Sequence, residues 1–213
     1  MIWHITQNET ILAVTKSILK RGFKTQAERL AIQYRENLNI HPCAPLCAFK
    51  LAEHLQIPIY SATEFLSEEN EINLLSGSNG TDCGWSALTM QTKAGNQIIV
   101  HNPFHSTARQ QSDMMHELAH IICKHEHSQQ SYDFEIPFGM REFDEVKEEE
   151  AKCLGSTLQL AKPCLLWADN RNMTNEAIAT HFNASVEMVT YRMNTTGIAK
   201  RKFYKKKNTN PQV

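Results

Sequence analysis

Apolar residues recur at helical spacing along several stretches of the chain, and this pattern predicts a mainly helical protein. In residues 25–38, TQAERLAIQYRENL, the apolar side chains fall on one helical face. Thr25 and Asp144 stand at the beginning of two such stretches, where a capping side chain is expected. The helices predicted in this way span residues 25–38, 44–55, 106–124 and 144–161.

Shorter segments have the composition that is typical of strands. WSALTMQT and NQIIVHN are separated by KAGN, and this arrangement predicts a β-hairpin. IPIY predicts a further short strand and SATEFL a turn of helix, whereas the Gly, Ser, Asn and Asp cluster in residues 74–84 predicts a loop. The chain is therefore expected to be an α+β protein, mostly helical, with a small antiparallel sheet.

The C-terminal part has a pattern of its own. Residues 174–196 predict two short helices joined at Asn183 and Ala184, with Ser185 as the cap of the second helix. This arrangement indicates a helix-turn-helix-like segment, and the alternative is a helical hairpin packed on the main domain. The predicted division is a main domain over residues 1–168, the helix-turn-helix-like segment over 169–199, and a disordered basic tail over 200–213.

Composition excludes several classes of protein. Of the 213 residues, 41% are hydrophobic and 21% are charged, a balance that supports a buried core. No stretch approaches the roughly 18 apolar residues of a membrane span, and the N-terminus lacks a secretion signal. We therefore expect a cytoplasmic protein whose six cysteines are free thiols. Cys43 and Cys47 resemble half of a zinc site, but no second pair has matching spacing.

The charge is unevenly distributed. The formal net charge is −1, and the segment KRKFYKKK carries six positive charges, which leaves −7 on the rest of the chain. A basic tail on an acidic body indicates weak contact with nucleic acid or with an acidic partner. The alternative is a solvated chain end.

The strongest chemical signal is the HExxH motif at residues 116–120. His116 and His120 are four residues apart, so both imidazoles project from one helix face and can bind one metal ion. Glu117 lies beside them, where it can accept a proton from metal-bound water. The metzincin pattern is excluded because Cys123 and Glu126 replace its glycine and third histidine.

A catalytic zinc ion needs a third protein ligand, and neither His125 nor His127 is well placed to provide it. His127 is about 10.5 Å from His120 along a continued helix. The downstream helix offers three glutamates at 148–150. Glu150 lies on an otherwise apolar helical row, whose other members are Val146, Leu154 and Leu158. We therefore predict Glu150 as the third ligand, with Glu149 as the alternative and Glu148 facing solvent.

NPFHSTARQQSDMMHELAHIICKH, followed by EEEAKCLGSTLQLAKP, resembles the ImmA/IrrE family of zinc metallopeptidases over roughly residues 20–200. The resemblance implies a minimal zincin-type fold with one Zn²⁺, held by His116, His120 and Glu150, and Glu117 as the catalytic residue. Met115 and Ala119 depart from the family pattern without removing a ligand.

The function expected from this resemblance is zinc-dependent cleavage of a protein substrate. The substrate would be a helix-turn-helix transcriptional repressor, in a stress response or in the regulation of a mobile element or of defence. Three side chains are candidates for stabilising the transition state: Tyr132, His125 and Arg109. The alternative function is a non-catalytic zinc-containing regulator that binds a protein partner or DNA.

Overall fold

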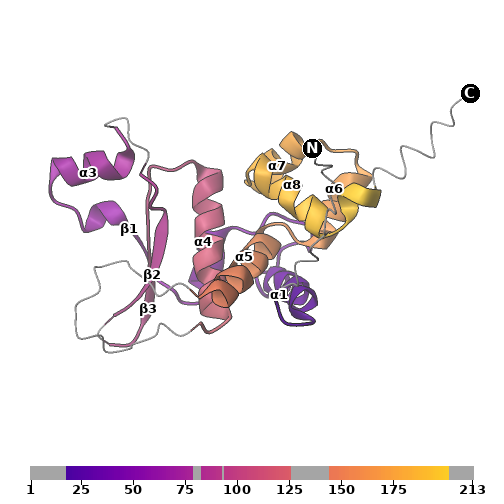
Figure 1. The fold of residues 1–213 in the computed structure, drawn as a ribbon, viewed down its shortest axis with the longest axis horizontal. Coiled ribbons are helices and arrows are strands. Elements are labelled where there is room, and N and C mark those ends of the chain that lie inside the picture. Colours follow the sequence, from indigo (N-terminus) through magenta and orange to yellow (C-terminus); the bar gives the residue numbers. More distant parts are fainter. Residues whose placement is uncertain (1–17, 79–82, 93, 126–143, 202–213) are drawn as a thin grey trace, which may run out of the picture.

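The structure, a computed structural model, describes residues 18–78, 83–92, 94–125 and 144–201. Figure 1 shows the sheet and α3 on one side and α1 and α6–α8 on the other, with α4 and α5 between them. In chain order the elements are α1 (Phe23–Asn37), α2 (Ala48–His54), β1 (Ile59–Ser61), the 3-10 helix η1 (Ala62–Glu64), α3 (Glu69–Ser76), β2 (Ala87–Gln91), β3 (Gln97–His101), α4 (Thr107–Ile122), α5 (Glu145–Gln159), α6 (Lys162–Asn170), α7 (Asn175–Phe182) and α8 (Val186–Thr195).

The predicted α+β class is confirmed, with a correction to the sheet. The strand order is β1–β3–β2, and the predicted hairpin is the antiparallel pair β2–β3. However, β1 pairs with β3 in parallel, so the sheet is mixed. Parallel pairing needs a long connection between the two strands, and the segment that contains α3 and β2 provides it.

Helix boundaries follow the sequence signals where a side-chain cap is present. The Ser106 side chain accepts a hydrogen bond from the Arg109 amide at the start of α4, and Asp144 caps α5 in the same way. The expectation for Thr25 was wrong, because α1 begins two residues earlier, after Gly22 in a left-handed conformation. Helices α3 and α6 were not predicted, and α3 extends into the expected loop.

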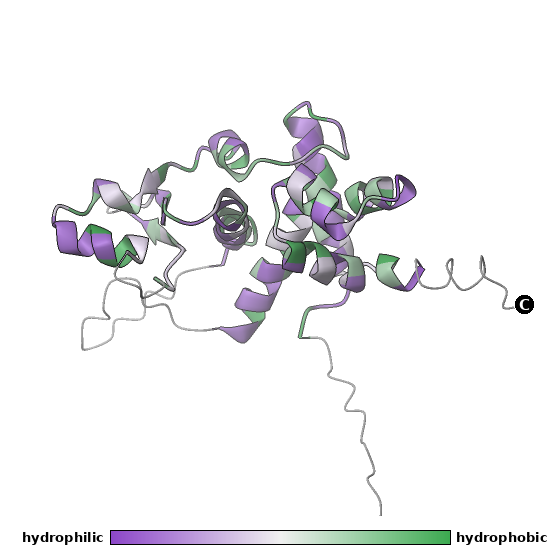
Figure 2. Ribbon diagram, turned by 90° about the horizontal axis from the view of Figure 1, so that it is seen from above, coloured by the Kyte–Doolittle hydropathy of each residue, from purple (hydrophilic) through white to green (hydrophobic). Residues whose placement is uncertain are grey.

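Helix α4 is the centre of the packing. It lies against β2, β3, α2 and α5, and its buried side chains include Met114, Met115 and Leu118. Helix α5 adds Leu154 and Leu158 to the same core. Figure 2 shows hydrophilic and hydrophobic residues alternating around the helices, as expected for amphipathic helices packed on a shared interior.

Gly155 sets how closely α4 and α5 approach each other. A Cβ atom added there would lie 2.9 Å from the Met115 carbonyl oxygen and 3.1 Å from the His116 Cα. Both neighbours are backbone atoms of α4, so neither can move without moving the helix. The two helices are therefore in direct backbone contact beside the first histidine of the HExxH motif.

Replacing Gly155 with alanine is expected to destabilise the protein by about 1–3 kcal/mol, because the added methyl group overpacks this contact. For the variant to be less stable, the cost of this clash must exceed the roughly 1 kcal/mol by which alanine stabilises a helix interior relative to glycine. Chemical unfolding measures the difference. Gly84→Ala is the matched control, since a Cβ atom at Gly84 has no neighbour within 4 Å. Equal stability of the two variants would contradict this account.

The C-terminal helices α7 and α8 share the core of the main helices. Ile178, Phe182 and Val189 are buried in the same hydrophobic cluster as α1, α4 and α5. The turn between them has Asn183 in a left-handed conformation, and Ser185 caps α8 as expected. The division at residue 169 stays a prediction, and the packing is that of a hairpin against the main core.

Arg192 connects α8 to distant parts of the chain. Its guanidinium lies 2.6 Å from the Glu28 carboxylate on α1 and donates to the Leu160 carbonyl after α5. From the predicted tail, Arg201 forms an ion pair of 2.6 Å with Asp169, and residues 202–213 lie outside the described residues. None of the described helices is long and apolar enough to cross a membrane.

Candidate metal centre

The two histidines of the HExxH motif meet on one face of α4. They are one helical turn apart, and their Nε2 atoms lie 3.1 Å from each other. The His120 side chain is 6% exposed, whereas that of His116 is 34% exposed. The pair is therefore held by the core on one side and is accessible from the other.

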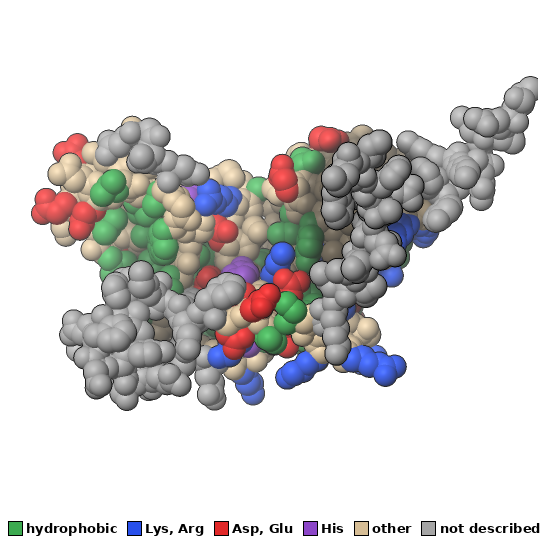
Figure 3. All heavy atoms as spheres, in the orientation of Figure 1, with side chains coloured by type: hydrophobic (Ala, Val, Ile, Leu, Met, Phe, Trp, Pro, Cys, Tyr) green, Lys and Arg blue, Asp and Glu red, His purple; other side chains and the backbone are tan. Residues whose placement is uncertain are grey.

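Helix α5 brings a carboxylate to this pair, and the residue is Glu148. Its carboxylate oxygens lie 3.1 Å from His116 Nε2 and 3.4 Å from His120 Nε2. The three side chains form a candidate metal-binding group whose ligand atoms all lie within 4.8 Å of one another. In the space-filling view, histidine and acidic side chains meet at the surface near the middle of the molecule (Figure 3).

The three glutamates of the acidic run take different positions. Glu150 faces inward as predicted, with 13% of its side chain exposed, but its carboxylate lies 3.0 Å from His125 Nε2. Glu149 is 36% exposed and pairs with Lys152. The structure thus places Glu148 beside the histidines, contrary to the expectation that Glu148 faces solvent and Glu150 joins the histidines.

Glu148 rather than Glu150 lies beside the histidines because of which row of α5 faces α4. The row that contacts α4 near His116 contains small residues, Ala151 and Gly155, and Glu148 lies three residues before Ala151 on the same side. The sequence prediction relied on the row that contains Val146, Leu154 and Leu158. Val146, the first residue of that row, is exposed in the structure. Small residues at helical spacing were the signal that sequence reasoning missed.

The donor set fits a divalent metal ion such as zinc. Two imidazole nitrogens and one carboxylate are ligands that many catalytic zinc sites use. Ligand atoms about 2.0–2.2 Å from a tetrahedral ion lie roughly 3.3–3.6 Å from one another. The separations of 3.1 and 3.4 Å between the donor atoms of His116, His120 and Glu148 are close to this range.

Glu117 lies on the side of α4 that faces the sheet. Its side chain is buried, and its Oε2 accepts hydrogen bonds from the Thr89 amide at 2.8 Å and from the Thr89 hydroxyl at 2.6 Å. Thr89 is in the middle of β2. Strand β2 therefore orients the carboxylate that follows the first histidine in the sequence.

A family comparison agrees with this geometry. The family model described as the IrrE N-terminal-like domain, a family of peptidases, matches residues 78–194. The matched segment is more than half of the chain and contains the whole candidate metal centre. The chain belongs to this family. No curated protein matches the chain.

The resemblance expected from the sequence is thus confirmed for this family, although the match begins at residue 78 rather than near residue 20. A peptidase of the IrrE-like family acts on peptide bonds, so a protein or peptide substrate is implied. The helices α1 and α2 precede the matched segment, and both pack into the core that carries the metal centre.

Of the two described candidates for transition-state stabiliser in this IrrE-like protein, Arg109 lies away from the metal centre and His125 lies beside His120. Arg109 precedes His116 by seven residues, about 10.5 Å along the helix, and it donates to the Ser86 hydroxyl at 3.0 Å. Asp113 lies 3.8 Å from the Arg109 guanidinium, and burial raises the pKa of this carboxyl.

The second candidate, His125, uses its ring nitrogens for contacts with Glu150 and His120. Tyr132 lies outside the described residues.

Thiolates do not contribute to the centre. Burial, together with the negative charge of Glu150, raises the pKa of Cys123 to about 11, so this thiol stays protonated at neutral pH. Within the described ranges, the group formed by His116, His120 and Glu148 is the only cluster with metal-ligand geometry. Cys43 and Cys47 do not belong to it.

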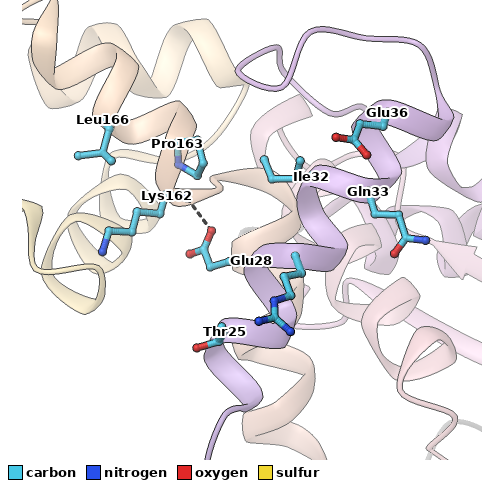
Figure 4. A pocket seen from close by; sticks show the side chains of 9 residues that line it. Thr25, Glu28, Ile32, Gln33, Glu36, Lys162, Pro163 and Leu166 are labelled. Carbon is cyan, nitrogen blue, oxygen red and sulfur yellow. Dashed lines mark hydrogen bonds between the residues drawn. The ribbon is translucent and has the colours of Figure 1, made fainter.

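A surface groove lies apart from this centre, between α1 and α6. Figure 4 shows Glu28 pointing across it and accepting a hydrogen bond from the Lys162 amide at 2.8 Å. Its lining residues are Thr25, Glu28, Arg29, Ile32, Gln33, Glu36, Lys162, Pro163 and Leu166. None of them is a histidine or a cysteine, so the groove does not extend the metal centre.

Proposed function

We propose that the protein is a zinc-dependent endopeptidase in which His116, His120 and Glu148 hold one Zn²⁺ and Glu117 transfers the protons. One observation carries this proposal. The carboxylate of Glu148 joins the two imidazoles of an HExxH helix in a member of a peptidase family. When bound there, zinc supplies a water molecule with a pKa of about 7 and a positive charge that polarises the substrate carbonyl.

The role proposed for Glu117 is supported by its position on α4, next to His116. It accepts a proton as water attacks the peptide carbonyl, and it gives this proton to the amine that leaves. The two hydrogen bonds from Thr89 hold its carboxylate in one orientation, so little rearrangement is needed before each transfer. Glu117 therefore serves as base in the first step and as acid in the second.

The peptidase family to which the chain belongs supports a protein substrate. Following the family resemblance, we propose a helix-turn-helix transcriptional repressor as the substrate, in stress response or mobile-element regulation.

The alternative of a DNA-binding regulator receives no support from α7 and α8. Arg192 is the only basic residue between Val186 and Thr195, and it is buried against Glu28 and the Leu160 carbonyl. A helix that reads DNA presents basic side chains to the phosphates. Among the described residues, this pair of helices offers packing rather than a basic surface.

The test is cleavage of the repressor encoded beside the gene, in a mixture of the two purified proteins. We expect about one zinc ion per chain by elemental analysis and a defined cleavage product by mass spectrometry. No product should form in the presence of a chelator, and cleavage should resume when zinc is added. A protein that contains no metal, or cleavage that is unaffected by the chelator, would contradict the proposal.

A further inference from the structure

A second histidine–carboxylate pair lies directly behind the candidate metal ligands. His125 Nδ1 lies 3.0 Å from His120 Nδ1, and His125 Nε2 lies 3.0 Å from a carboxylate oxygen of Glu150. Both side chains of the pair are largely buried. His120 therefore directs Nε2 towards Glu148 and His116, and Nδ1 towards His125.

The local backbone brings His125 to this position. Helix α4 ends at Ile122, and Lys124 adopts a left-handed conformation with φ 55°. The chain then turns back, and the His125 amide donates to the His120 carbonyl at 3.0 Å. This turn folds the imidazole of His125 over the last turn of α4, next to the ring of His120.

The direction of these hydrogen bonds follows from the chemistry of the last acceptor. An ionised Glu150 carboxylate can only accept, so His125 Nε2 carries the proton. A neutral His125 then has only a lone pair on Nδ1, which must accept from the Nδ1–H of His120. The remaining lone pair of His120 is on Nε2, which is the nitrogen that faces Glu148.

We propose that His125 and Glu150 are positioning residues that keep His120 in the tautomer, and in the ring orientation, that binds the metal ion. This inference rests on the proposed zinc site. It gives Glu150 a role in the centre without making it a ligand. Outer partners of this kind change metal affinity by about 10- to 100-fold when they are removed.

The test is the zinc dissociation constant of the purified full chain, measured by competition with a chromophoric chelator. We expect His125→Ala and Glu150→Leu each to weaken zinc binding by about 10- to 100-fold. Glu150→Gln keeps an oxygen acceptor for His125 Nε2–H, so its loss should be smaller. Glu149→Ala, which removes an exposed carboxylate from the same helix, should bind zinc like the wild type.

A double-mutant cycle separates this role from simple packing. If the two residues act through one chain of hydrogen bonds, the double variant His125→Ala/Glu150→Leu should bind zinc about as weakly as either single variant. Melting of the metal-free proteins shows whether each variant folds. If His125→Ala does not fold, the difference between Glu150→Leu and Glu150→Gln decides the question.

The outcomes also distinguish this inference from the proposed function. A wild-type protein that binds no zinc would overturn the zinc site and, with it, the positioning role. A wild-type protein that binds zinc, with folded His125→Ala and Glu150→Leu variants of unchanged affinity, would overturn the positioning role alone.

Discussion

Replacing Glu117 with glutamine is expected to slow proteolysis by orders of magnitude while zinc stays bound. The amide has nearly the same shape as the carboxylate, and it can still accept hydrogen bonds from the Thr89 amide and hydroxyl. It cannot accept a proton from water, so cleavage should slow by about 10²- to 10⁴-fold, the usual contribution of a general base. Single-turnover cleavage of the repressor, together with elemental analysis of the variant, measures both effects.

Glu149→Gln is the matched control for this substitution. It makes the same chemical change at an exposed carboxylate that pairs with Lys152 rather than with the histidines. It should retain wild-type cleavage and wild-type zinc content. Cleavage by Glu117→Gln at the wild-type rate would exclude Glu117 as the proton acceptor, even if zinc remains essential.

Replacing Glu148 with alanine is expected to remove zinc and activity together. The substitution deletes the carboxylate that lies 3.1 Å from His116 Nε2 and, among the described residues, leaves the two imidazoles as metal ligands. The loss of zinc affinity should exceed the roughly 10- to 100-fold loss caused by removing an outer partner. Competition with a chelator measures the zinc affinity of the three glutamate variants. We expect the largest loss of affinity for Glu148→Ala, a smaller loss for Glu150→Ala and no loss for Glu149→Ala.

This ranking also tests the two accounts of the third ligand against each other. If Glu148→Ala kept its zinc while Glu150→Ala lost it, Glu150 rather than Glu148 would be the third ligand. Unfolding of the metal-free variants is the necessary control, because the Glu150 side chain is 13% exposed and that of Glu148 is 34% exposed. Loss of zinc then reports on ligation rather than on folding.

Local signals predicted most of the helices near the site. The apolar stripe of α4 and the caps Ser106 and Asp144 are properties of residues close together in the chain. The local sequence is therefore enough to predict helices α4 and α5. The arrangement of the sheet, in contrast, depends on a distant partner. The parallel pairing of β1 with β3, which makes the sheet mixed, is set by residues about 40 positions apart.

The C-terminal helices illustrate the same limit. Their existence and the cap at Ser185 were predicted from local pattern, but the pattern left open whether they stand apart or pack on the main domain. The buried contact of Arg192 with Glu28 and with the Leu160 carbonyl joins three segments that are far apart in the chain. Only folding brings these partners together.

The sequence by itself determined the reactive half of the site, because HExxH places His116, Glu117 and His120 on one helix whose geometry is fixed by local hydrogen bonds. Only the tertiary structure decided which glutamate completes the group. That choice depends on how α5 is rotated against α4, and the rotation is set where Gly155 meets the α4 backbone. The contact selects the row with small residues, so Glu148 reaches the histidines and Glu150 reaches His125.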